Sequence, residues 1–276
     1  MRTAAPVTTR DALRQATARL DAAGCDTPRL DAEVLLSHVL HTDRLRLVPA
    51  PTSRLAPSDA KRFDDLVARR EAREPVAYII GCKPFRRLSV EVDRTVLIPR
   101  PETELLVEVG LELPAGARVL DVGTGSGAVA LALKHERPDL QVVGADASEP
   151  ALAVARQNAA HLALDVEFTC ADLLAGAGGP FDAVLANLPY VAPDEWDELA
   201  PEVHHEPREA LVAADAGLAA NRRLVRDAGG AGVRLLAVEV GAGQAEAIAA
   251  AMRQAGFARV DTRPDLAGIP RVVVGR

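Results

Sequence analysis

The regular alternation of short apolar segments with helical segments from residue 118 onward constrains the fold most. Five segments are short, rich in apolar residues and bounded by turn formers, which predicts buried strands: RVLDVG (118–123), QVVGAD (141–146), DVEFTC (165–170), FDAVLA (181–186) and GVRLLAVEV (232–240). Apolar residues recur at helical spacing in residues 127–135, 149–162, 217–228 and 243–255. This alternation predicts an α/β fold with a mainly parallel, doubly wound sheet, to which residues 257–276 add two further strands.

The N-terminal part of the chain has a different texture, because only helical patterns occur there. Helix starts are expected at Thr9, Thr27 and Ser58, since Thr and Ser cap helix N-termini well. Further along, β-branched residues alternate with polar ones in short pieces, which predicts a β-hairpin. The expected domains are a helical bundle over residues 1–74, a hairpin linker over residues 75–98 and the α/β domain over residues 99–276.

Composition excludes several classes of protein. The net charge is -7, so the chain lacks the positive field that drives nucleic-acid binding, and no direct nucleic-acid partner is expected. Cys25, Cys82 and Cys170 are odd in number and far apart, and His204 and His205 have no third ligand spaced to join them. Neither a disulfide framework nor a metal site is therefore predicted. No apolar run approaches the roughly 20 residues that span a bilayer, and we expect a cytoplasmic protein.

A glycine-rich turn follows the first predicted strand of the α/β domain. The stretch RVLDVGTGSGAVALAL places Gly123, Thr124, Gly125, Ser126 and Gly127 between a strand and a helix. Glycines let the backbone approach a ligand closely, and the helix that follows presents free N–H groups. A nucleotide-like cofactor is expected on this turn. The same residues also fit a G-x-G-x-x-A dinucleotide pattern, so glycine spacing alone leaves NAD open.

Two acidic residues bear on the choice of cofactor. Asp146 ends the next predicted strand, where its carboxylate can bind ribose hydroxyls of either kind of cofactor. Asp121 precedes the first glycine, and an anion there suits a positively charged ligand better than a pyrophosphate. S-adenosylmethionine carries a sulfonium and an amino group, so Asp121 favours it. The alternative for Asp121 is a buried turn acid whose oxygens accept backbone N–H groups.

Taken together, the motifs resemble a known family. DVGTGSG, Asp146, the pair Asp172 and Leu173, and the NLPY that follows the fourth strand resemble class I methyltransferases, which use S-adenosylmethionine. EPVAYIIG (74–81), VLIPRPETE (96–104), EPREAL (206–211) and GL (217–218) narrow the resemblance to bacterial peptide chain release factor glutamine methyltransferases. These motifs occur in the family's order over nearly the whole chain. The resemblance implies a Rossmann-like sheet with a small N-terminal helical bundle and a hairpin connector.

The resemblance also implies roles for individual residues. The glycine turn would line the methionine part of the cofactor, Asp146 would hold the ribose, and Asp172 with Leu173 would border the adenine. Asn187, Leu188, Pro189 and Tyr190 would hold the glutamine of the Gly-Gly-Gln loop of a release factor, which the N-terminal bundle would grasp. Arg100 either touches this substrate or only begins the helix that Pro101 permits. The family commonly has a bulkier side chain where Leu173 stands.

The NLPY motif suits the chemistry of an amide. An amide nitrogen is a poor nucleophile, so a methyltransferase must orient it and favour its tetrahedral form. The side-chain oxygen of Asn187 and the main-chain carbonyl of Leu188 can each accept one N–H of the amide, and Tyr190 can pack against it or against the cofactor. The usual family motif is Asn-Pro-Pro-Tyr. Leu188 supplies the same carbonyl and, because it precedes Pro189, is biased toward the same extended backbone.

Other functions stay open on the sequence. A glutamine methyltransferase acting on a ribosomal protein would carry the same motif, and an adenine N6 DNA methyltransferase activates an exocyclic nitrogen in a similar way. The negative charge argues against the DNA enzyme. A dinucleotide-dependent oxidoreductase, or a binding module made inert by Leu188, belongs to a different class. Binding of NADH or of S-adenosylmethionine separates these readings.

Overall fold

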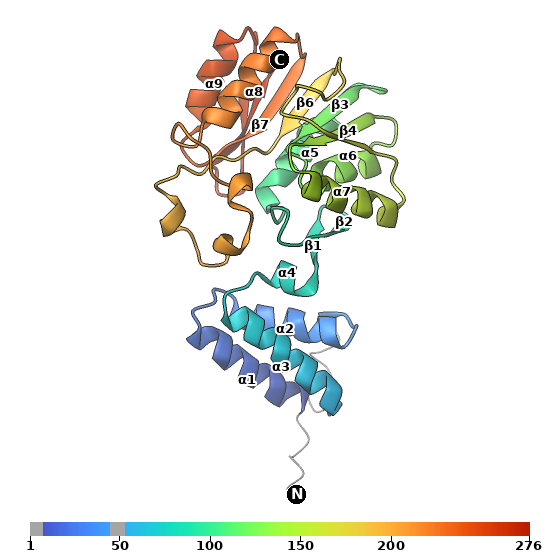
Figure 1. Cartoon of the computed structure of the whole chain (residues 1–276), viewed down its shortest axis with the longest axis vertical. Helices are drawn as coiled ribbons and strands as arrows, with labels where there is room; N and C mark the ends of the chain where they lie inside the picture. The colour runs from blue at the N-terminus through green and yellow to red at the C-terminus, as the bar shows by residue number, and fades with distance from the viewer. Residues whose placement is uncertain (1–7, 45–52) are drawn as a thin grey trace, which may run out of the picture. The chain divides into compact units, whose positions relative to one another are not determined.

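The computed structural model describes residues 8–44 and 53–276. The chain divides into two compact units, Met1–Gly81 with Ala200–His205, and Cys82–Leu199 with Glu206–Arg276. Figure 1 colours the chain from blue in the N-terminal helices to red in the C-terminal part of the α/β unit. Each unit is described by itself below.

The N-terminal unit is a small bundle of helices, α1 (Thr9–Ala22), α2 (Pro28–Val39), α3 (Pro57–Glu71) and the short α4 (Val76–Ile80). Its core is apolar and includes the buried Leu20, Leu35 and Phe63. The expected helix starts are correct to within one or two residues. Thr8, not Thr9, caps α1 by accepting the Asp11 N–H, and Ser58 lies inside α3 because Pro57 takes the first helical position, where its missing N–H costs nothing.

An ionic network joins the segment Ala200–His205 to this bundle. Glu202 accepts hydrogen bonds from Arg73 at 2.7 Å and pairs with the buried Arg70 at 2.7 Å. Arg70 also pairs with the buried Asp31 on α2 at 2.7 Å. Burial of Glu202 opposes its ionisation, but the bonds from Arg73 and Arg70 outweigh this and lower the pKa of its carboxyl to about 2. The charged end of α3 therefore fixes a segment that is more than a hundred residues away in sequence.

The boundary between the units lies at Gly81, seven residues beyond the expected end of the bundle at residue 74. The reason is α4, which packs against α2 and α3 and ends at Gly81, whose φ is +77°. The expected hairpin follows directly. Its strands β1 (Cys82–Phe85) and β2 (Leu88–Glu91) pair antiparallel, with Cys82 opposite Glu91.

Seven strands of the described residues form one sheet, in the order β5-β4-β3-β6-β7-β9-β8. Their bounds are β3 (Arg118–Val122), β4 (Gln141–Asp146), β5 (Glu167–Cys170), β6 (Ala183–Ala186), β7 (Leu235–Glu239), β8 (Val260–Pro264) and β9 (Pro270–Gly275). The first five are parallel, and β9 runs antiparallel to both β7 and β8. The expected fold class is thereby confirmed, with the strand order reversing between β3 and β6.

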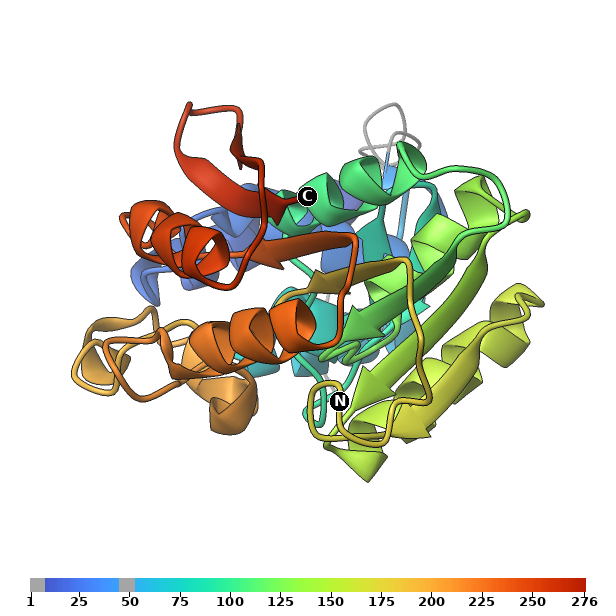
Figure 2. The same ribbon diagram turned by 90° about the horizontal axis from the view of Figure 1, so that it is seen from above.

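Helices cover both faces of this sheet, as Figure 2 shows from above. Their bounds are α5 (Glu104–Leu111), α6 (Ala128–Glu136), α7 (Glu149–Leu162), α8 (Ala219–Gly230) and α9 (Ala245–Gln254), with short 3-10 turns at Pro101–Thr103, Trp196–Glu198, Val203–His205 and Arg208–Ala210. α5 packs on α6, while α8 packs on α9. Leu120, Val184 and Leu236 on the central strands are fully buried between the layers.

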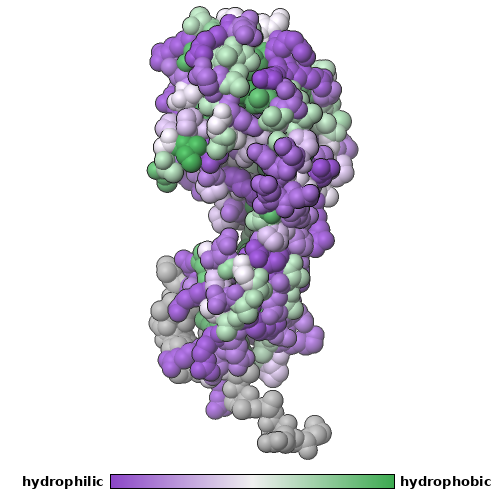
Figure 3. Space-filling view, turned by 90° about the vertical axis from the view of Figure 1, so that its left-hand side faces the viewer, coloured by the Kyte–Doolittle hydropathy of each residue, from purple (hydrophilic) through white to green (hydrophobic). Residues whose placement is uncertain are grey.

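The surface is largely polar. The face in Figure 3 shows hydrophilic side chains with apolar residues scattered among them. Among the described residues, no helix is both long enough and apolar enough to cross a membrane. Each unit has a core of buried apolar residues.

Candidate active site

A cavity of about 370 Å³ lies at the carboxyl ends of the central strands of the α/β unit. In an open α/β sheet, the point where the strand order reverses is where ligands bind, and here this point lies between β3 and β6. The cavity brings together these residues that the sequence singled out: Gly123, Gly125, Asp146, Asp172, Leu173, Asn187, Leu188 and Pro189. Residues of VLIPRPETE and EPREAL also line it, among them Leu97 and Pro207.

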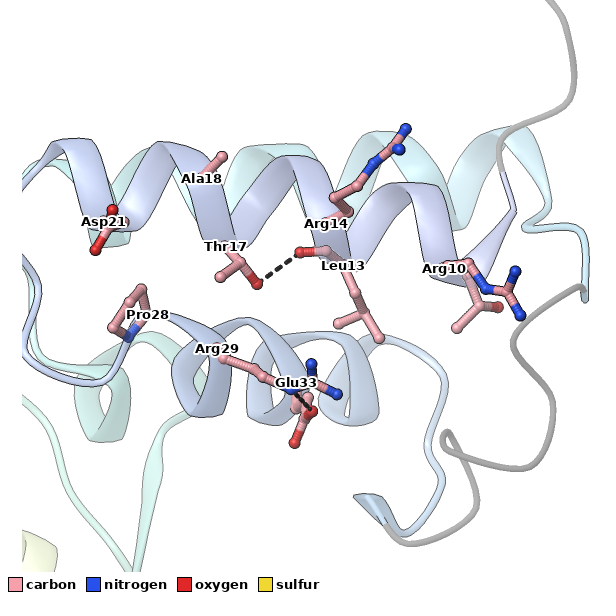
Figure 4. Close-up of a pocket in the computed structure, with 10 residues that line it drawn as sticks. Arg10, Leu13, Arg14, Thr17, Ala18, Asp21, Pro28, Arg29 and Glu33 are labelled. Atoms are coloured by element: carbon pink, nitrogen blue, oxygen red, sulfur yellow. Dashed lines mark hydrogen bonds and ion pairs between the residues drawn. The ribbon is translucent and has the colours of Figure 1, made fainter.

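A larger cavity, of about 680 Å³, lies in the N-terminal unit between α1 and α2. Figure 4 shows Arg10, Arg14 and Arg29 along it, with Arg29 paired to Glu33 at 2.9 Å. None of the predicted site residues lines this cavity. We therefore place the candidate active site in the smaller cavity, because the glycine turn and the NLPY motif meet there.

The positions of the three glycines in the turn require glycine for different physical reasons. All have positive φ, of +70° at Gly123, +54° at Gly125 and +81° at Gly127. A Cβ on Gly125 would meet nothing within 4 Å, so the backbone is open to the cavity there. A Cβ on Gly127 would lie 3.2 Å from Ala155 and from Phe168, which reflects close packing of helix on strand. Gly125 is thus the position where a ligand can approach the backbone closely.

Asp146 holds the glycine turn from the end of β4. One carboxylate oxygen accepts the Gly125 N–H at 2.9 Å, and the other accepts the Ser148 N–H at 2.9 Å. A carboxylate offers about four acceptor positions, so two are left for hydroxyl groups in the cavity. The carboxylate is therefore placed to serve both the turn and a sugar.

Asp121 and its neighbour Thr124 lie in a different setting from the expected one. Asp121 is buried and outside the cavity lining, and its Oδ2 accepts the Thr124 hydroxyl at 2.6 Å and the Ala130 N–H at 3.2 Å. Burial raises the pKa of the Asp121 carboxyl to about 6, although both hydrogen bonds lower it. This geometry matches the alternative of a buried turn acid, so Asp121 no longer favours a sulfonium ligand over other cofactors.

Ser126 is buried and is held by a residue that sequence reasoning missed. Its carbonyl accepts a hydrogen bond from Asn158 Nδ2 on α7 at 2.9 Å. Asn158, also buried, further exchanges two hydrogen bonds with the backbone of Glu91 on the hairpin, at 2.7 and 3.0 Å. Asn158 thus ties the hairpin to the glycine turn. Nothing in the local sequence distinguishes this asparagine from a solvent-facing one.

At the expected adenine side, Asp172 and Leu173 both line the cavity. The Asp172 carboxylate accepts two hydrogen bonds from Arg223 of α8, at 2.9 and 2.8 Å. Leu173 has a φ of +56°, an unfavourable backbone conformation for a leucine, and its side chain packs on the core. Strain of this kind gathers at ligand sites, which agrees with the expected position of Leu173.

The NLPY motif leaves β6 at the rim of the cavity. Asn187 Nδ2 donates a hydrogen bond to the Thr103 hydroxyl at 3.1 Å. Leu188 is buried in the core beside Gly123, with its Cδ2 about 3 Å from the position of a Cβ there. Tyr190 lies outside the cavity lining, and its hydroxyl donates to Glu239 at 3.4 Å. Packing of the Tyr190 ring on a substrate amide therefore stays a prediction.

Arg100 belongs to a contact between two sequence motifs. Its guanidinium donates to the buried Glu206 at 2.5 Å and to the Ile98 carbonyl at 3.0 Å, and Glu206 also accepts the Ile98 N–H at 2.9 Å. VLIPRPETE and EPREAL are thus joined by this pair. Arg100 does not line the cavity, so a contact with substrate stays a prediction. Among the described residues, no group of three His, Cys, Asp or Glu side chains could hold a metal ion.

Glu239, at the end of β7, is a buried acid that sequence reasoning missed. Its Oε2 has no hydrogen-bond partner within the described residues. Burial raises the pKa of its carboxyl to about 7, and Glu102 adds to the rise. The hydroxyls of Thr103 and Tyr190, and the charge of Arg271, act in the opposite direction. The sequence signal that could have pointed to Glu239 is its place as an acid directly at the end of an apolar strand, beside NLPY.

This burial predicts a pH dependence of stability. The folded protein holds the Glu239 proton more tightly than the unfolded chain, so its contribution is complete below the usual pKa of 4.5 and is lost as pH rises to about 7. We expect Glu239→Gln to gain up to about 3 kcal/mol in free energy of unfolding over wild type between about pH 4 and about pH 8. Urea unfolding of both proteins across this range measures it. A difference that is constant with pH would contradict the assignment.

Comparisons with known proteins identify the family of this chain. The family model of the PrmC N-terminal domain matches residues 11–81, and that of the methyltransferase small domain matches residues 101–215. The release factor glutamine methyltransferase of Deinococcus radiodurans is 41% identical, with 97% of this chain and 98% of that protein covered. Those of Cereibacter sphaeroides and Escherichia coli are 44% and 37% identical, each with 96% of this chain and 97% of the relative covered. This chain belongs to the release factor glutamine methyltransferase family.

Solved structures of other methyltransferases share the fold at low identity. The hMettl16 catalytic domain in complex with MAT2A 3'UTR hairpin 6 superposes with a TM-score of 0.60 at 14% identity, covering 72% of this chain and 80% of that one. A methyltransferase from Pyrococcus furiosus superposes with a TM-score of 0.52 at 15% identity, covering 67% and 87%. These likenesses support the class I methyltransferase fold of the family member described here and say nothing of its substrate.

Proposed function

We propose that this protein transfers a methyl group from S-adenosylmethionine to the side-chain amide nitrogen of the glutamine in the Gly-Gly-Gln loop of peptide chain release factors. The observation that carries the proposal is a single cavity lined by both the glycine turn and the Asn187–Leu188 segment. Family membership supports the release factor as substrate, and its methylation would act on translation termination. The N-terminal bundle is the part of the chain proposed to bind the substrate protein.

The cofactor fits the residues that surround the cavity. The open backbone at Gly125 can lie against the methionine part, and Asp146 has acceptor positions left for the ribose hydroxyls. Leu173 provides an apolar border for an adenine, and the backbone near Asp172 provides a polar one. When bound, S-adenosylmethionine supplies a sulfonium-activated methyl carbon.

The reaction needs the amide nitrogen to point its electron pair at that carbon. Two acceptors on one side of the substrate amide, the Asn187 side-chain oxygen and the Leu188 carbonyl, would take its two N–H groups and leave the lone pair directed across the cavity. Orientation of this kind is worth up to roughly 7 to 11 kcal/mol in favourable systems. As the N–C bond forms, the S–C bond breaks with its electrons going to sulfur, and the nitrogen then loses a proton to water.

Label transfer tests the proposal. The protein is mixed with methyl-labelled S-adenosylmethionine and a release factor whose loop glutamine is intact or replaced by alanine. We expect label only on the intact substrate, at the side-chain amide. Equal label on both substrates would refute the glutamine assignment. Tight binding of NADH without binding of S-adenosylmethionine would refute the methyltransfer itself.

Leu188→Pro restores the common family motif and tests what this position supplies. If it supplies only a carbonyl on an extended backbone, kcat for methyl transfer should stay the same or rise. Leu188 is only 5% exposed, so losing its side chain should cost roughly 1 to 3 kcal/mol of fold stability. Steady-state transfer rates and thermal melts separate the two effects. A fall in kcat at a temperature where the variant is folded would contradict this account of Leu188.

A further inference from the structure

The side-chain amide of Asn187 can face the cavity in two ways, and only one of them is useful. With its oxygen toward the cavity it accepts an N–H of the substrate amide, and with its nitrogen there it would oppose that N–H. Nothing about the asparagine itself selects one orientation. The selection has to come from the groups behind it.

Thr103 lies behind Asn187 and belongs to the PETE run of VLIPRPETE. It is buried, with 5% exposed, and its hydroxyl accepts the hydrogen bond from Asn187 Nδ2 at 3.1 Å. A hydroxyl can also donate, however, and then it would bind the Asn187 oxygen and turn the amide round. Which role the hydroxyl takes depends on where its own proton goes.

Glu239 accounts for that proton. It is 1% exposed, its Oε2 has no hydrogen-bond partner within the described residues, and the Thr103 side chain lies close enough to lower the pKa of its carboxyl. The Tyr190 hydroxyl donates to the same carboxyl at 3.4 Å. A free oxygen of this buried carboxyl can take the Thr103 proton, which would leave the threonine oxygen as an acceptor toward Asn187.

We infer that Thr103 and Glu239 are positioning residues that fix the Asn187 amide with its oxygen toward the substrate. The three residues come from the turn before α5, the end of β6 and the end of β7, and Asn187 is 84 residues from Thr103 in sequence. Neither Thr103 nor Glu239 lines the cavity, so both act through Asn187. The inference rests on the proposed function, because it needs Asn187 to bind the substrate amide.

Thr103→Val is the main test, since valine keeps the shape and removes the hydroxyl. We expect kcat for methyl transfer to fall roughly tenfold or more, with the dissociation constant of S-adenosylmethionine changed less than about twofold. Thr103→Ser restores a hydroxyl and should bring kcat back to within about threefold of wild type. Thr262→Val, on the edge strand β8, removes a threonine hydroxyl far from the site and should leave kcat unchanged.

A double-mutant cycle distinguishes positioning from a merely structural role. In an Asn187→Ala background there is no amide to orient, so Thr103→Val should lower kcat by less than about twofold further. Glu239→Leu should behave like Thr103→Val in both backgrounds, and Glu239→Gln, which keeps an acceptor oxygen, should retain more activity than Glu239→Leu. Thermal melts of each variant set the temperature at which all of them are folded.

The outcomes separate the inference from the proposed function. Additive losses in the cycle, or no rescue by Thr103→Ser, would overturn the inference while wild-type transfer to the loop glutamine stands. If wild-type protein labels a release factor that lacks this glutamine equally well, the proposed function fails and the inference fails with it. Non-additive losses with rescue by serine would support both.

Discussion

Replacing Asn187 with alanine is expected to lower kcat for methyl transfer by about 100- to 1,000-fold, because it removes one of the two acceptors that orient the substrate amide. Loss of one preorganised hydrogen-bonding group at a reacting centre costs about this much in other enzymes. Cofactor affinity should change much less, by under about tenfold, since the glycine turn and Asp146 stay in place. Single-turnover transfer and equilibrium binding of S-adenosylmethionine measure the two quantities.

Asn221→Ala provides the matched control for Asn187→Ala. Asn221 is fully buried on α8 and its amide donates to the Glu239 main-chain oxygen, but it does not line the cavity. Its loss should lower fold stability by roughly 1 to 3 kcal/mol and leave kcat within a few-fold of wild type in the folded protein. If both variants lower kcat equally, Asn187 has no special part in the reaction.

Gly217→Ala is expected to disturb both the fold and the site. Gly217, in the GL that follows EPREAL, has a φ of +77°, and a Cβ there would lie 1.9 Å from the Tyr190 main-chain oxygen. Gln244 Nε2 donates to that same oxygen at 2.8 Å, so the backbone of NLPY is held between Gln244 and Gly217. An added methyl must push the motif away, and we expect a loss of about 3 kcal/mol or more in stability and at least about tenfold in kcat.

Gly116→Ala separates the clash at Gly217 from backbone strain. Gly116 has a similar φ of +74°, but a Cβ on it would meet nothing within 4 Å. It should therefore show only the cost of a left-handed alanine, about 1 kcal/mol, with kcat unchanged. Urea unfolding and transfer rates of the two variants, measured side by side, test the assignment. Equal losses of stability in both would mean that the contact with Tyr190 is unimportant.

The sequence predicted the elements of the sheet well because each strand carries a local signal. The helix predicted over residues 149–162 is observed as Glu149–Leu162, since Ser148, which accepts the Ala151 N–H, marks its start and Ala163 in the left-handed region marks its end. The ends of β3, β4 and β6 also lie where the apolar runs stop. These signals are local, so they can be read without knowing which strands pair.

The residues that hold the site in place could not be predicted from local sequence in the same way. Thr103, Asn158 and Glu239 become important only through partners that are distant in sequence, and each looks ordinary beside its own neighbours. Asp121 shows the opposite problem, because its place before the glycines suggested a contact with cofactor while its carboxylate in fact binds Thr124 and the start of α6. Local sequence indicates which residues stand near a turn but not where their side chains point.

A structure of the protein with S-adenosylhomocysteine and a release factor fragment that contains the Gly-Gly-Gln loop would test the central claim most directly. We predict that the glutamine side-chain nitrogen lies within hydrogen-bond distance of both Asn187 Oδ1 and the Leu188 carbonyl oxygen, with Asn187 Nδ2 still on Thr103. A glutamine amide bound elsewhere in the cavity, or an Asn187 side chain turned away from it, would contradict the account.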